Sequence, residues 1–399
     1  MKVVIAMDSF KGALSASEAG ASVAAGLTQA WSLLRPNEPP LRCVNLPLAD
    51  GGEGLIDCLR PLLEAQGFRA VTLPVQRANL YQPAVTATML VKEPECYIEC
   101  AQAIGLPLLA PHERDLMTAS SYGLGQMINH ALKLGCSDLK IGLGGSATND
   151  LGLGLAQALG VKFEGGAGEG LSSENGFISE VESWSKFSAL DDSALQQRLK
   201  ALKCKVTLLS DVTNPLLGPH GATYVFGAQK GADAAQQARL ERALTDGAKL
   251  LTAHYGQDFT NTLGAGAAGG LGAGLMYLMG AKVVSGINTV LELLNFDTEL
   301  KDADLVITGE GRFDTQSING KGPVGIAARA RAHHLPTWVL CGSKDARVTP
   351  AQLHELGINA CLSITPGPIA IEDSIAQTKQ LLTGTAANLM MGALSLQAR

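Results

Sequence analysis

The amino-acid sequence predicts an α/β protein of two domains, one discontinuous and built on a parallel sheet, the other inserted into it and of mixed α/β structure. Its 399 residues are too many for one ordinary hydrophobic core. Short apolar runs alternate with helical patterns at both ends of the chain, which is typical of parallel sheets. The 46 glycines cluster after the apolar runs and before the helical patterns, which favours active sites built from loops.

Composition and charge limit the classes of function. Apolar residues make up 46% of the chain and charged residues 17%, so we expect a large core and no extended disorder. The net charge of −6 argues against a nucleic-acid partner. The eight cysteines include no C-x-x-C pair, which is typical of reduced thiols in a cytoplasmic protein. We expect no membrane partner, because the apolar start of the chain is too short for a signal peptide and the uncharged run 259–281 is dominated by glycine and alanine.

The first 65 residues predict two strand–loop–helix units in succession, and such units require a parallel sheet. Residues 3–6 form a short buried strand, and Asp8–Gly12 is the loop that follows it. Ser15 or Ser17 caps a helix that runs to about Leu34. The second unit has a strand at 43–48, a loop at 50–54 and a helix to about Ala65.

The end of the chain repeats this order. Its expected elements are a strand at 304–308, a long loop at 309–322, a helix from Pro323 to about His333, and strands at 335–340 and 359–364. The middle of the chain differs, because 85–91 and 96–99 alternate like an antiparallel hairpin. Its other expected elements are strands at 138–143 and 205–210 and a polar, exposed excursion at 164–200. We therefore predict a discontinuous parallel α/β domain at 1–75 plus 285–399 and an inserted mixed α/β domain at 76–284.

The loops at the carboxyl ends of the predicted parallel strands form the first candidate site, because ligands of open parallel sheets bind there. Carboxylates, cations and exposed backbone N–H groups gather in these loops, which is what phosphoryl transfer needs. Each residue taken alone is better explained as a loop cap or a surface ion pair, but the repetition at several strand ends favours a site. The candidates are Asp8, Lys11 and Asp314 for catalysis, Ser9, Asp50, Gly51, Gly52 and Arg312 for substrate binding, and Glu310 for a metal ion.

The segment Gly142–Asp150 forms a second candidate site, between a predicted strand and a helix to about Leu159. Glycines let backbone N–H groups approach a phosphate, and a helix N-terminus adds a favourable field. A tight turn with a helix cap is the alternative without a function. The candidates for nucleotide binding are Gly144, Gly145, Ser146, Thr148 and Asn149, of which the last three are also candidates for Mg²⁺ coordination.

The same segment supplies a rival hypothesis. Gly142, Gly144 and Ala147 fit the G-x-G-x-x-A pattern of dinucleotide-binding loops, and Glu164 ends the next apolar run. An NAD(P)-dependent oxidoreductase is therefore the alternative to a phosphotransferase. A binding protein for small molecules, without enzymatic activity, is a third hypothesis.

Two more residues extend the second site. Asp211 follows the strand at 205–210 and could hold Mg²⁺ through its oxygen atoms, although an Asx-turn ended by Pro215 explains it equally well. Lys230 stands between glycines in the segment 226–231, as a phosphate contact would. A solvated loop lysine is the alternative interpretation of Lys230.

Taken together, these segments resemble the bacterial type-one glycerate kinase family. The matching segments are 8–12, 14–16, 49–54, 142–150, 211–216, 226–231, 264–272, 307–314, 316–317 and 320–321. They follow one another in order over nearly the whole chain, which makes the resemblance far more specific than any single glycine motif. Met7, Leu151, Ala228 and Leu263 stand where proline or glycine is usual. These departures change the stiffness of the backbone and leave its charge and hydrogen bonding in place.

The resemblance implies phosphorylation of D-glycerate to 2-phosphoglycerate by a cytoplasmic enzyme that uses ATP and Mg²⁺, and it implies that the discontinuous domain is flavodoxin-like. Loop position and charge then predict the roles of single residues. Lys11, Arg312 and the N–H groups after Asp50 are expected to bind the carboxylate of the substrate. Asp8 or Asp314 is expected to accept the proton of the attacking hydroxyl.

The predicted place of the nucleotide follows from the second site. We expect the triphosphate to lie against residues 144–146 and Lys230, where glycines and a cation come together. We expect Mg²⁺ near Asp211 or Glu310, since Mg²⁺ prefers carboxylate oxygens.

Overall fold

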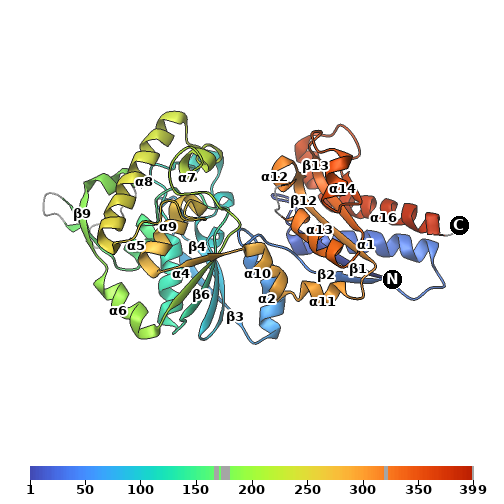
Figure 1. Cartoon of the computed structure of the whole chain (residues 1–399), viewed down its shortest axis with the longest axis horizontal. Helices are drawn as coiled ribbons and strands as arrows, with labels where there is room; N and C mark the ends of the chain where they lie inside the picture. Colours follow the sequence, from blue (N-terminus) through green and yellow to red (C-terminus); the bar gives the residue numbers. More distant parts are fainter. Residues whose placement is uncertain (166–169, 172–179, 319–321, 398–399) are drawn as a thin grey trace. The chain divides into compact units, whose positions relative to one another are not determined.

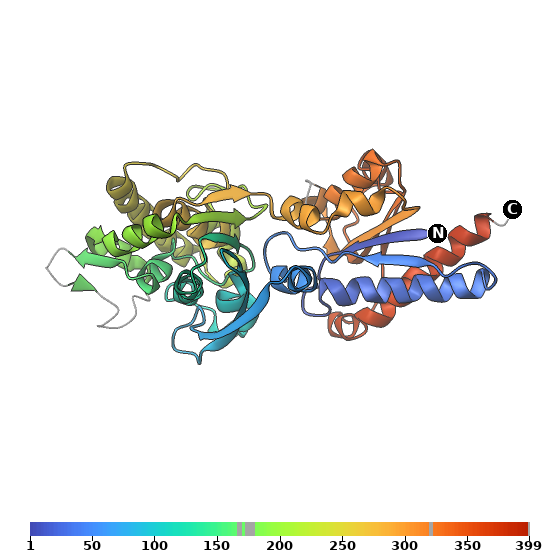
Figure 2. The same cartoon turned by 90° about the horizontal axis from the view of Figure 1, so that it is seen from below.

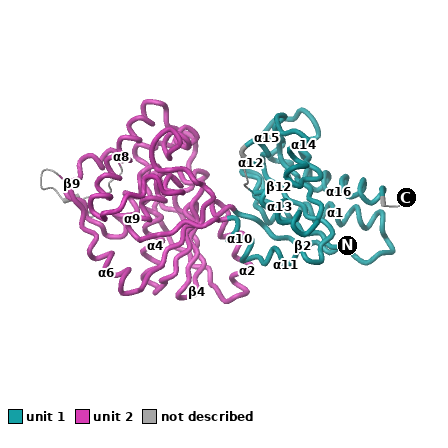
Figure 3. Tube along the Cα trace, viewed as in Figure 1, with its two compact units in different colours: residues 1–49, 287–399 teal, residues 50–286 magenta. Residues whose placement is uncertain are grey.

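The computed structural model gives the fold of most of the chain (Figure 1). The described residues are 1–165, 170–171, 180–318 and 322–397. By their contacts they form two compact units, drawn in separate colours in Figure 3: unit 1 comprises residues 1–49 and 287–399, and unit 2 comprises residues 50–286. Unit 1 contains a parallel sheet and unit 2 a mixed sheet, so the predicted α/β class is confirmed.

Unit 1 is built on a five-stranded sheet in which every neighbouring pair is parallel. Its strands are β1 (Lys2–Met7), β2 (Arg42–Asn45), β12 (Leu305–Phe313), β13 (Thr337–Lys344) and β14 (Ala360–Ser363). They lie in the order β14-β13-β12-β1-β2, which is 2-1-3-4-5 when the strands are numbered within the unit and is the flavodoxin-like order. The strand order reverses between β1 and β12, and ligands of such sheets bind beyond the carboxyl ends of the strands at this point.

Helices cover both faces of the sheet in unit 1 (Figures 1 and 2). They are α1 (Ala16–Leu34), α10 (Gly286–Leu293), α11 (Phe296–Leu300), α12 (Thr315–Ile318), α13 (Pro323–Ala332), α14 (Pro350–Glu355), α15 (Ile371–Ala376) and α16 (Thr378–Gln397). Side chains of β1 alternate between the two faces. Val3 and Ile5 pack against α1 and α16, which lie side by side, while Val4 and Ala6 pack against α10, α11 and α13. Burial on both faces explains why the sequence of β1 is a continuous apolar run.

Two local features of unit 1 resolve or correct the sequence analysis. Ser15 is the residue that caps α1: its hydroxyl accepts from the N–H of Glu18, and the Glu18 carboxylate accepts from the N–H of Ser15. The loop predicted from residue 309 is wrong over its first five residues, because β12 continues to Phe313. Pairing with β13 accounts for the difference, since Glu310 lies opposite Cys341 in the sheet.

Unit 2 contains a six-stranded sheet in the order β11-β10-β6-β5-β4-β3. Its strands are β3 (Arg69–Val75), β4 (Val85–Lys92), β5 (Glu95–Glu99), β6 (Asp138–Gly142), β10 (Lys205–Leu209) and β11 (Lys282–Val284). The predicted antiparallel hairpin of β4 and β5 is confirmed, whereas β5, β6, β10 and β11 are parallel. Residues 50–75 lie with unit 2 because β3 pairs with β4, although the sequence analysis placed them with the discontinuous domain.

All described helices of unit 2 but one contribute to one large apolar core, and the helix at Leu55–Ala65 packs on β3, β4 and β5 instead. The helices are α2 (Leu55–Ala65), α3 (Ala101–Ile104), α4 (Tyr122–Lys133), α5 (Leu153–Ala158), α6 (Ser193–Leu202), α7 (Ala222–Phe226), α8 (Ala234–Tyr255) and α9 (Ala267–Met279), with 3-10 turns at Leu106–Leu108, Pro111–Glu113, Val181–Lys186 and Ala228–Lys230. Residues 267–279 of the uncharged glycine-rich run form the buried α9. None of the helices in the described ranges has both the length and the apolar character needed to cross a membrane.

The excursion predicted at 164–200 is not an exposed polar segment throughout. It contributes a small antiparallel sheet of β7 (Lys162–Gly165), β8 (Gly170–Leu171) and β9 (Phe187–Asp191). Trp184 and Phe187 are buried and pack on Phe163, with ring centroids 5.5 and 4.7 Å from it. These large apolar side chains stand among polar residues in the sequence, which hides their role in the core. The predicted glycine run 165–170 lies partly outside the described residues.

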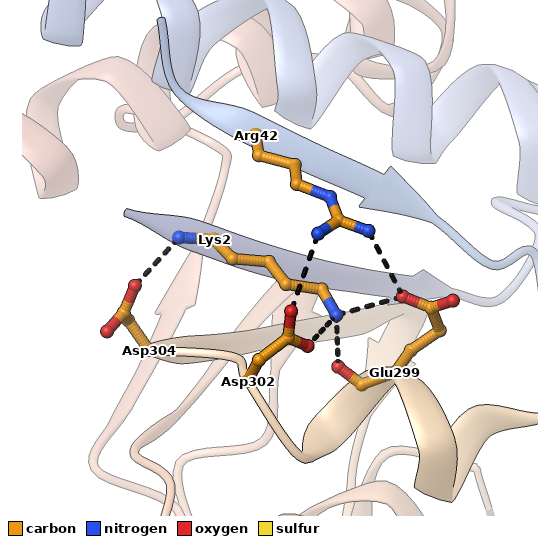
Figure 4. Close-up of polar contacts among 5 residues, drawn as sticks. All are labelled: Lys2, Arg42, Glu299, Asp302 and Asp304. Carbon is orange, nitrogen blue, oxygen red and sulfur yellow. Dashed lines mark hydrogen bonds and ion pairs between the residues drawn. The ribbon is translucent and has the colours of Figure 1, made fainter. Parts of the chain in front are cut away.

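A buried lysine forms hydrogen bonds and ion pairs at the amino ends of the strands in unit 1 (Figure 4). Lys2 begins β1, and its ammonium group donates to the backbone oxygen of Glu299 at 2.7 Å and contacts the carboxylates of Glu299 and Asp302. Arg42 reaches the same two carboxylates from β2 but is mostly exposed. Burial lowers the pKa of Lys2, but the hydrogen bonds and charges of Asp302 and Glu299 outweigh it and raise that pKa above its ordinary value.

Replacing Lys2 by Met is expected to lower the free energy of unfolding by about 1–3 kcal/mol, because hydrogen bonds from a buried charged group are lost. Urea denaturation at pH 7 measures the change. The Lys2 contribution is present below the ordinary pKa of 10.5 and is lost only as the pH rises through the higher folded value. Arg42→Met is the control and should cost less than about 1 kcal/mol, since Arg42 is exposed. Equal losses in the two variants would contradict the role given to burial.

Candidate active site

The carboxyl ends of β1 and β12 bring one group of candidate residues together in unit 1. Asp8 directly follows β1, and its backbone N–H donates to the carbonyl oxygen of Gly309 on β12 at 2.9 Å. The Asp8 carboxylate accepts from the N–H of Ser9 at 2.6 Å. The charges of Asp8, Lys11 and Asp314 all act on Glu310, which places these groups near one another. This cluster lies where the strand order of the sheet reverses.

Glu310 has the environment of a ligand-binding carboxylate. Its Oε1 atom is buried and has no hydrogen-bond partner among the described residues. Burial raises the pKa of Glu310 to about 7, and the charges of Asp8 and Asp314 add to the effect, against the Ser317 hydroxyl and Lys11. A buried oxygen atom without a partner is costly unless a ligand or cation completes its interactions.

Arg312 and Asp314 flank Glu310 on the extended β12 and the turn after it. Their side chains form an ion pair, with Arg312 Nε 3.3 Å from Asp314 Oδ2. The Arg312 side chain is 69% exposed, so this pair contributes little to stability and the guanidinium group can reach a ligand. The hydroxyl of Ser317 accepts from the backbone N–H of Asp314 at 3.2 Å, which holds the turn.

Asp50, Gly51 and Gly52 begin unit 2 and follow Leu48, whose backbone N–H donates to the carbonyl oxygen of Met7 at 2.9 Å. They lie against the turn after β6. A Cβ atom on Gly144 would stand 2.7 Å from the Cα atom of Gly52, and one on Gly142 would stand 2.3 Å from the carbonyl oxygen of Gly51. The Asp50 carboxylate accepts from the N–H of Gly52 at 2.9 Å. The two loops therefore touch backbone to backbone, which requires glycine on both sides.

Lys230 is buried beside the same turn. Its Nζ atom donates to the hydroxyl of Ser146 at 3.1 Å and to the carbonyl oxygen of Thr148 at 2.8 Å. Burial lowers the pKa of Lys230 to about 8, while Cys100 and Asp150 oppose the shift. The sequence alternative of a solvated lysine is wrong, since Lys230 is only 5% exposed. A buried ammonium group bound to neutral oxygen atoms is well placed to receive an anion.

Two polar side chains of the turn also have oxygen atoms that could form further hydrogen bonds. Thr148 Oγ1 and Asn149 Oδ1 are buried without a hydrogen-bond partner in the described part of the chain. The amide group of Asn149 donates to the hydroxyl of Thr223 at 3.1 Å, which fixes its orientation. The Thr148 hydroxyl, like Ser146 and the N–H groups of the glycines, can donate to phosphate oxygens, whereas the Asn149 oxygen can only accept a hydrogen bond or bind a cation.

A helix follows the glycine turn, as the sequence analysis predicted, but its N-terminus is bound by the carboxylate of Asp150. The following helix α5 begins only at Leu153. The buried carboxylate of Asp150 accepts from the N–H of Gly152, just before the helix, at 3.1 Å and from that of Gly154, in its first turn, at 3.2 Å. Ser121 donates to the same carboxylate. Asp150 is thus a structural residue, and the helix field is not available to a ligand of the glycine turn.

Asp211 lies beyond the carboxyl end of β10 and accepts from the hydroxyl of Ser285 at 2.7 Å. In the described part of the chain, no three His, Cys, Asp or Glu side chains gather in a way that could hold a metal ion. Mg²⁺ commonly binds through one or two carboxylates together with substrate phosphates. Asp211 and Glu310 each fit this kind of ligation, and the buried Oε1 atom of Glu310 fits it best.

Two residues at the carboxyl end of β5 were missed by the sequence analysis. Glu99 binds the loop before α2, and Cys100 binds Gly144, with the sulfur atom 3.2 Å from its carbonyl oxygen and 3.4 Å from its nitrogen. Pairing of β5 with β6 places Glu99 opposite Gly142. The signal was available, because a carboxylate at the end of a predicted strand is the same pattern that identified Asp8.

Three comparisons with known proteins point to the same family. The model of the glycerate kinase family matches residues 3–393. A glycerate kinase from Bacillus cereus is 37% identical over 389 residues, covering 98% of this chain and 97% of that protein. A glycerate 2-kinase from Escherichia coli K12 is 38% identical over 365 residues, covering 91% of this chain and 90% of that protein. A crystal structure from Salmonella typhimurium LT2, of a protein with the provisional name glycerate kinase 2, superposes with a TM-score of 0.76 at 36% identity and covers all of both chains.

Proposed function

Because the chain belongs to the glycerate kinase family and is a phosphotransferase with an alcohol group as acceptor, we propose that it transfers the γ-phosphoryl group of ATP to the 2-hydroxyl of D-glycerate. The product is then 2-phosphoglycerate. The observation that carries the proposal is the buried Lys230, which stands beside a glycine turn and donates to neutral oxygen atoms. The Escherichia coli relative named glycerate 2-kinase supports the choice of the 2-hydroxyl.

The residues of unit 1 act on the acid substrate in this proposal. Lys11 and Arg312 are both exposed at the cluster that contains Asp8 and bind the carboxylate of glycerate, with help from Ser9. Asp8 or Asp314 orients the attacking hydroxyl and accepts its proton. Both carboxylates stand beside Glu310, where the strand order reverses. Positioning and charge are the main requirements of phosphoryl transfer, since little covalent chemistry falls to the protein.

The residues of unit 2 bind the nucleotide in this proposal. The N–H groups of Gly144 and Gly145 and the hydroxyl of Ser146 bind phosphate oxygens, and Lys230 neutralises their charge. The unused hydroxyl of Thr148 donates to a further phosphate oxygen, and the amide oxygen of Asn149, which can only accept, is a candidate ligand of Mg²⁺. The N–H groups after Asp50, which lie against the same turn, bind the carboxylate of the acid substrate.

Asp211 or Glu310 is the residue that would hold Mg²⁺. When bound, Mg²⁺ neutralises charge that develops on the phosphate oxygens. The carboxylate of the ligating residue would orient the ion, and the hydroxyl of Ser285 fixes the carboxylate of Asp211.

Product identification tests the proposed function. The purified chain is incubated with ATP, Mg²⁺ and D-glycerate, ADP release is followed by a coupled assay, and the product is identified by ³¹P NMR. We expect 2-phosphoglycerate and no ADP release without glycerate. Formation of 3-phosphoglycerate would contradict the assigned hydroxyl, and a lack of ADP release at every substrate concentration would contradict the whole proposal.

A further inference from the structure

Glu99 is a buried carboxylate that no step of the proposed reaction uses. It ends β5 in unit 2 and is 2% exposed. One carboxylate oxygen accepts from the N–H of Gly54 and the other from the N–H of Ile56, both at 3.0 Å. Gly54 precedes α2 with a φ of 86° and supplies no side-chain cap. Both oxygen atoms of Glu99 are therefore engaged in capping α2 from a strand 45 residues away.

The same strand end also holds the glycine turn. Cys100, the next residue, is buried and contacts both the nitrogen and the carbonyl oxygen of Gly144 through its sulfur atom. Glu99 thus binds the loop at 50–54 while Cys100 binds the turn at 144–145. The distance between these two loops is set by glycine contacts on both sides. The carboxyl end of β5 is the common support of the two segments that bind ligands in unit 2.

We propose that Glu99 is a positioning residue, whose ionised carboxylate holds the loop at 50–54 against the glycine turn and whose protonation loosens that loop. The proposal rests on the proposed function, in which the N–H groups after Asp50 bind the acid substrate. A neutral carboxyl group carries a proton on one oxygen and loses an acceptor there. One of the two N–H groups, on Gly54 or Ile56, is then left without its partner in a buried position.

Burial places the titration of Glu99 near neutral pH. Burial raises the pKa of Glu99 to about 7, against the hydrogen bonds from Ile56 and Gly54, and the charges of Asp57 and Glu53 add to the rise. Glu53 and Asp57 face it from the loop and the first turn of α2, and Cys100 from its own strand. The loop is fully held above about pH 7 and loosens as the pH falls below it.

The variant Glu99→Gln tests the proposal through the pH profile of kcat/KM for D-glycerate. Glutamine has one acceptor oxygen and turns its NH₂ group toward the second N–H, so it mimics the loosened state at every pH. We expect kcat/KM of Glu99→Gln at pH 8 to be about 10- to 100-fold lower than that of the wild type. The fall of kcat/KM with decreasing pH that is centred near pH 7 in the wild type should be absent in the variant. Glu95→Gln, at the other end of the same strand, keeps the wild-type profile. An unchanged acid limb in Glu99→Gln would overturn the proposal.

Asp57→Asn provides a second test that leaves Glu99 in place. Removing this charge stabilises the ionised form of Glu99, so we expect the midpoint of the acid limb to move to lower pH while kcat/KM at pH 8 stays unchanged. This variant decides the question even if Glu99→Gln does not fold. A midpoint that stays in place would overturn the role of Glu99.

Hydrogen exchange separates the proposal from the proposed function, because it needs no turnover. In the wild type, the amides of residues 54–56, corrected for the intrinsic effect of pH on exchange, should lose protection between pH 8 and pH 6. The Glu99→Gln variant should show the low protection at both values. If the wild type never consumes ATP, the proposed function fails while this measurement still decides the role of Glu99. Constant protection across this range would refute it.

Discussion

Replacing Asp8 by Asn is expected to lower kcat by about 10²- to 10⁴-fold, the usual contribution of a general base. Asparagine has the same shape as aspartate and can still accept from the N–H of Ser9, so the loop after β1 keeps its hydrogen bond. It cannot accept the proton of the attacking hydroxyl. Rates of ADP release at saturating ATP and D-glycerate measure the effect, which should be in kcat and not in KM.

Asp314→Asn completes this test, because Asp314 is the other candidate for the base. If Asp314 is the base, the large decrease in kcat is expected in Asp314→Asn, and Asp8→Asn retains most of the wild-type kcat. Asp304→Asn serves as the control: Asp304 accepts from the backbone N–H of Lys2 at the opposite edge of the same sheet, and asparagine can keep that bond. Values of kcat within about tenfold of wild type, or about 1.4 kcal/mol, in both Asp8→Asn and Asp314→Asn would refute the base assignment.

Replacing Lys230 by Met is expected to reduce kcat/KM for ATP by about 30-fold to several thousand-fold, which corresponds to about 2–5 kcal/mol for a buried charged partner of an anion. Methionine fills a similar volume but cannot donate to Ser146, to Thr148 or to a phosphate. Steady-state kinetics with varied ATP measure the loss, which should appear as a higher KM for ATP and a lower kcat.

Stability measurements distinguish this loss from misfolding. Burial disfavours the charged form of Lys230 and lowers its pKa to about 8, so the native protein bears a cost for this charge that the methionine side chain removes. We expect the midpoint of urea unfolding to change little. Lys249→Met is the control, since the Lys249 side chain is 74% exposed on α8, and it should leave both measurements unchanged. Unaltered ATP kinetics in Lys230→Met would contradict the proposed nucleotide site.

Local sequence patterns predicted the elements whose causes are local. The continuous apolar run of β1 and the Ser15–Glu18 capping box of α1 depend on neighbours within a few residues. The extension of β12 through Glu310 depends instead on pairing with β13, which a glycine-rich segment does not reveal. The burial of Trp184 likewise depends on a distant residue, since its ring packs on Phe163 of β7.

The same distinction between local and distant causes applies to the residues of the candidate site. Residues at strand ends, such as Asp8 and Asp211, could be selected because the carboxyl ends of parallel strands share an edge. The contact of Gly52 with Gly144 could not be predicted, because it joins segments about 90 residues apart in the chain. Lys230 was selected for its flanking glycines, but its burial follows from contacts 82 and 84 residues away. Glu99 could have been selected as a strand-end carboxylate, but its contact with the loop before α2 joins residues 45 positions apart.

The contact of Gly52 with Gly144 has a thermodynamic consequence for the proposed reaction. No side chain separates the two backbones at this point, so neither can shift by the width of a methyl group without displacing the other. If the first binds the acid and the second the nucleotide, ordering by one ligand lowers the entropy cost of binding the other. Thermodynamic linkage then requires each substrate to raise the binding affinity of the other by the same factor.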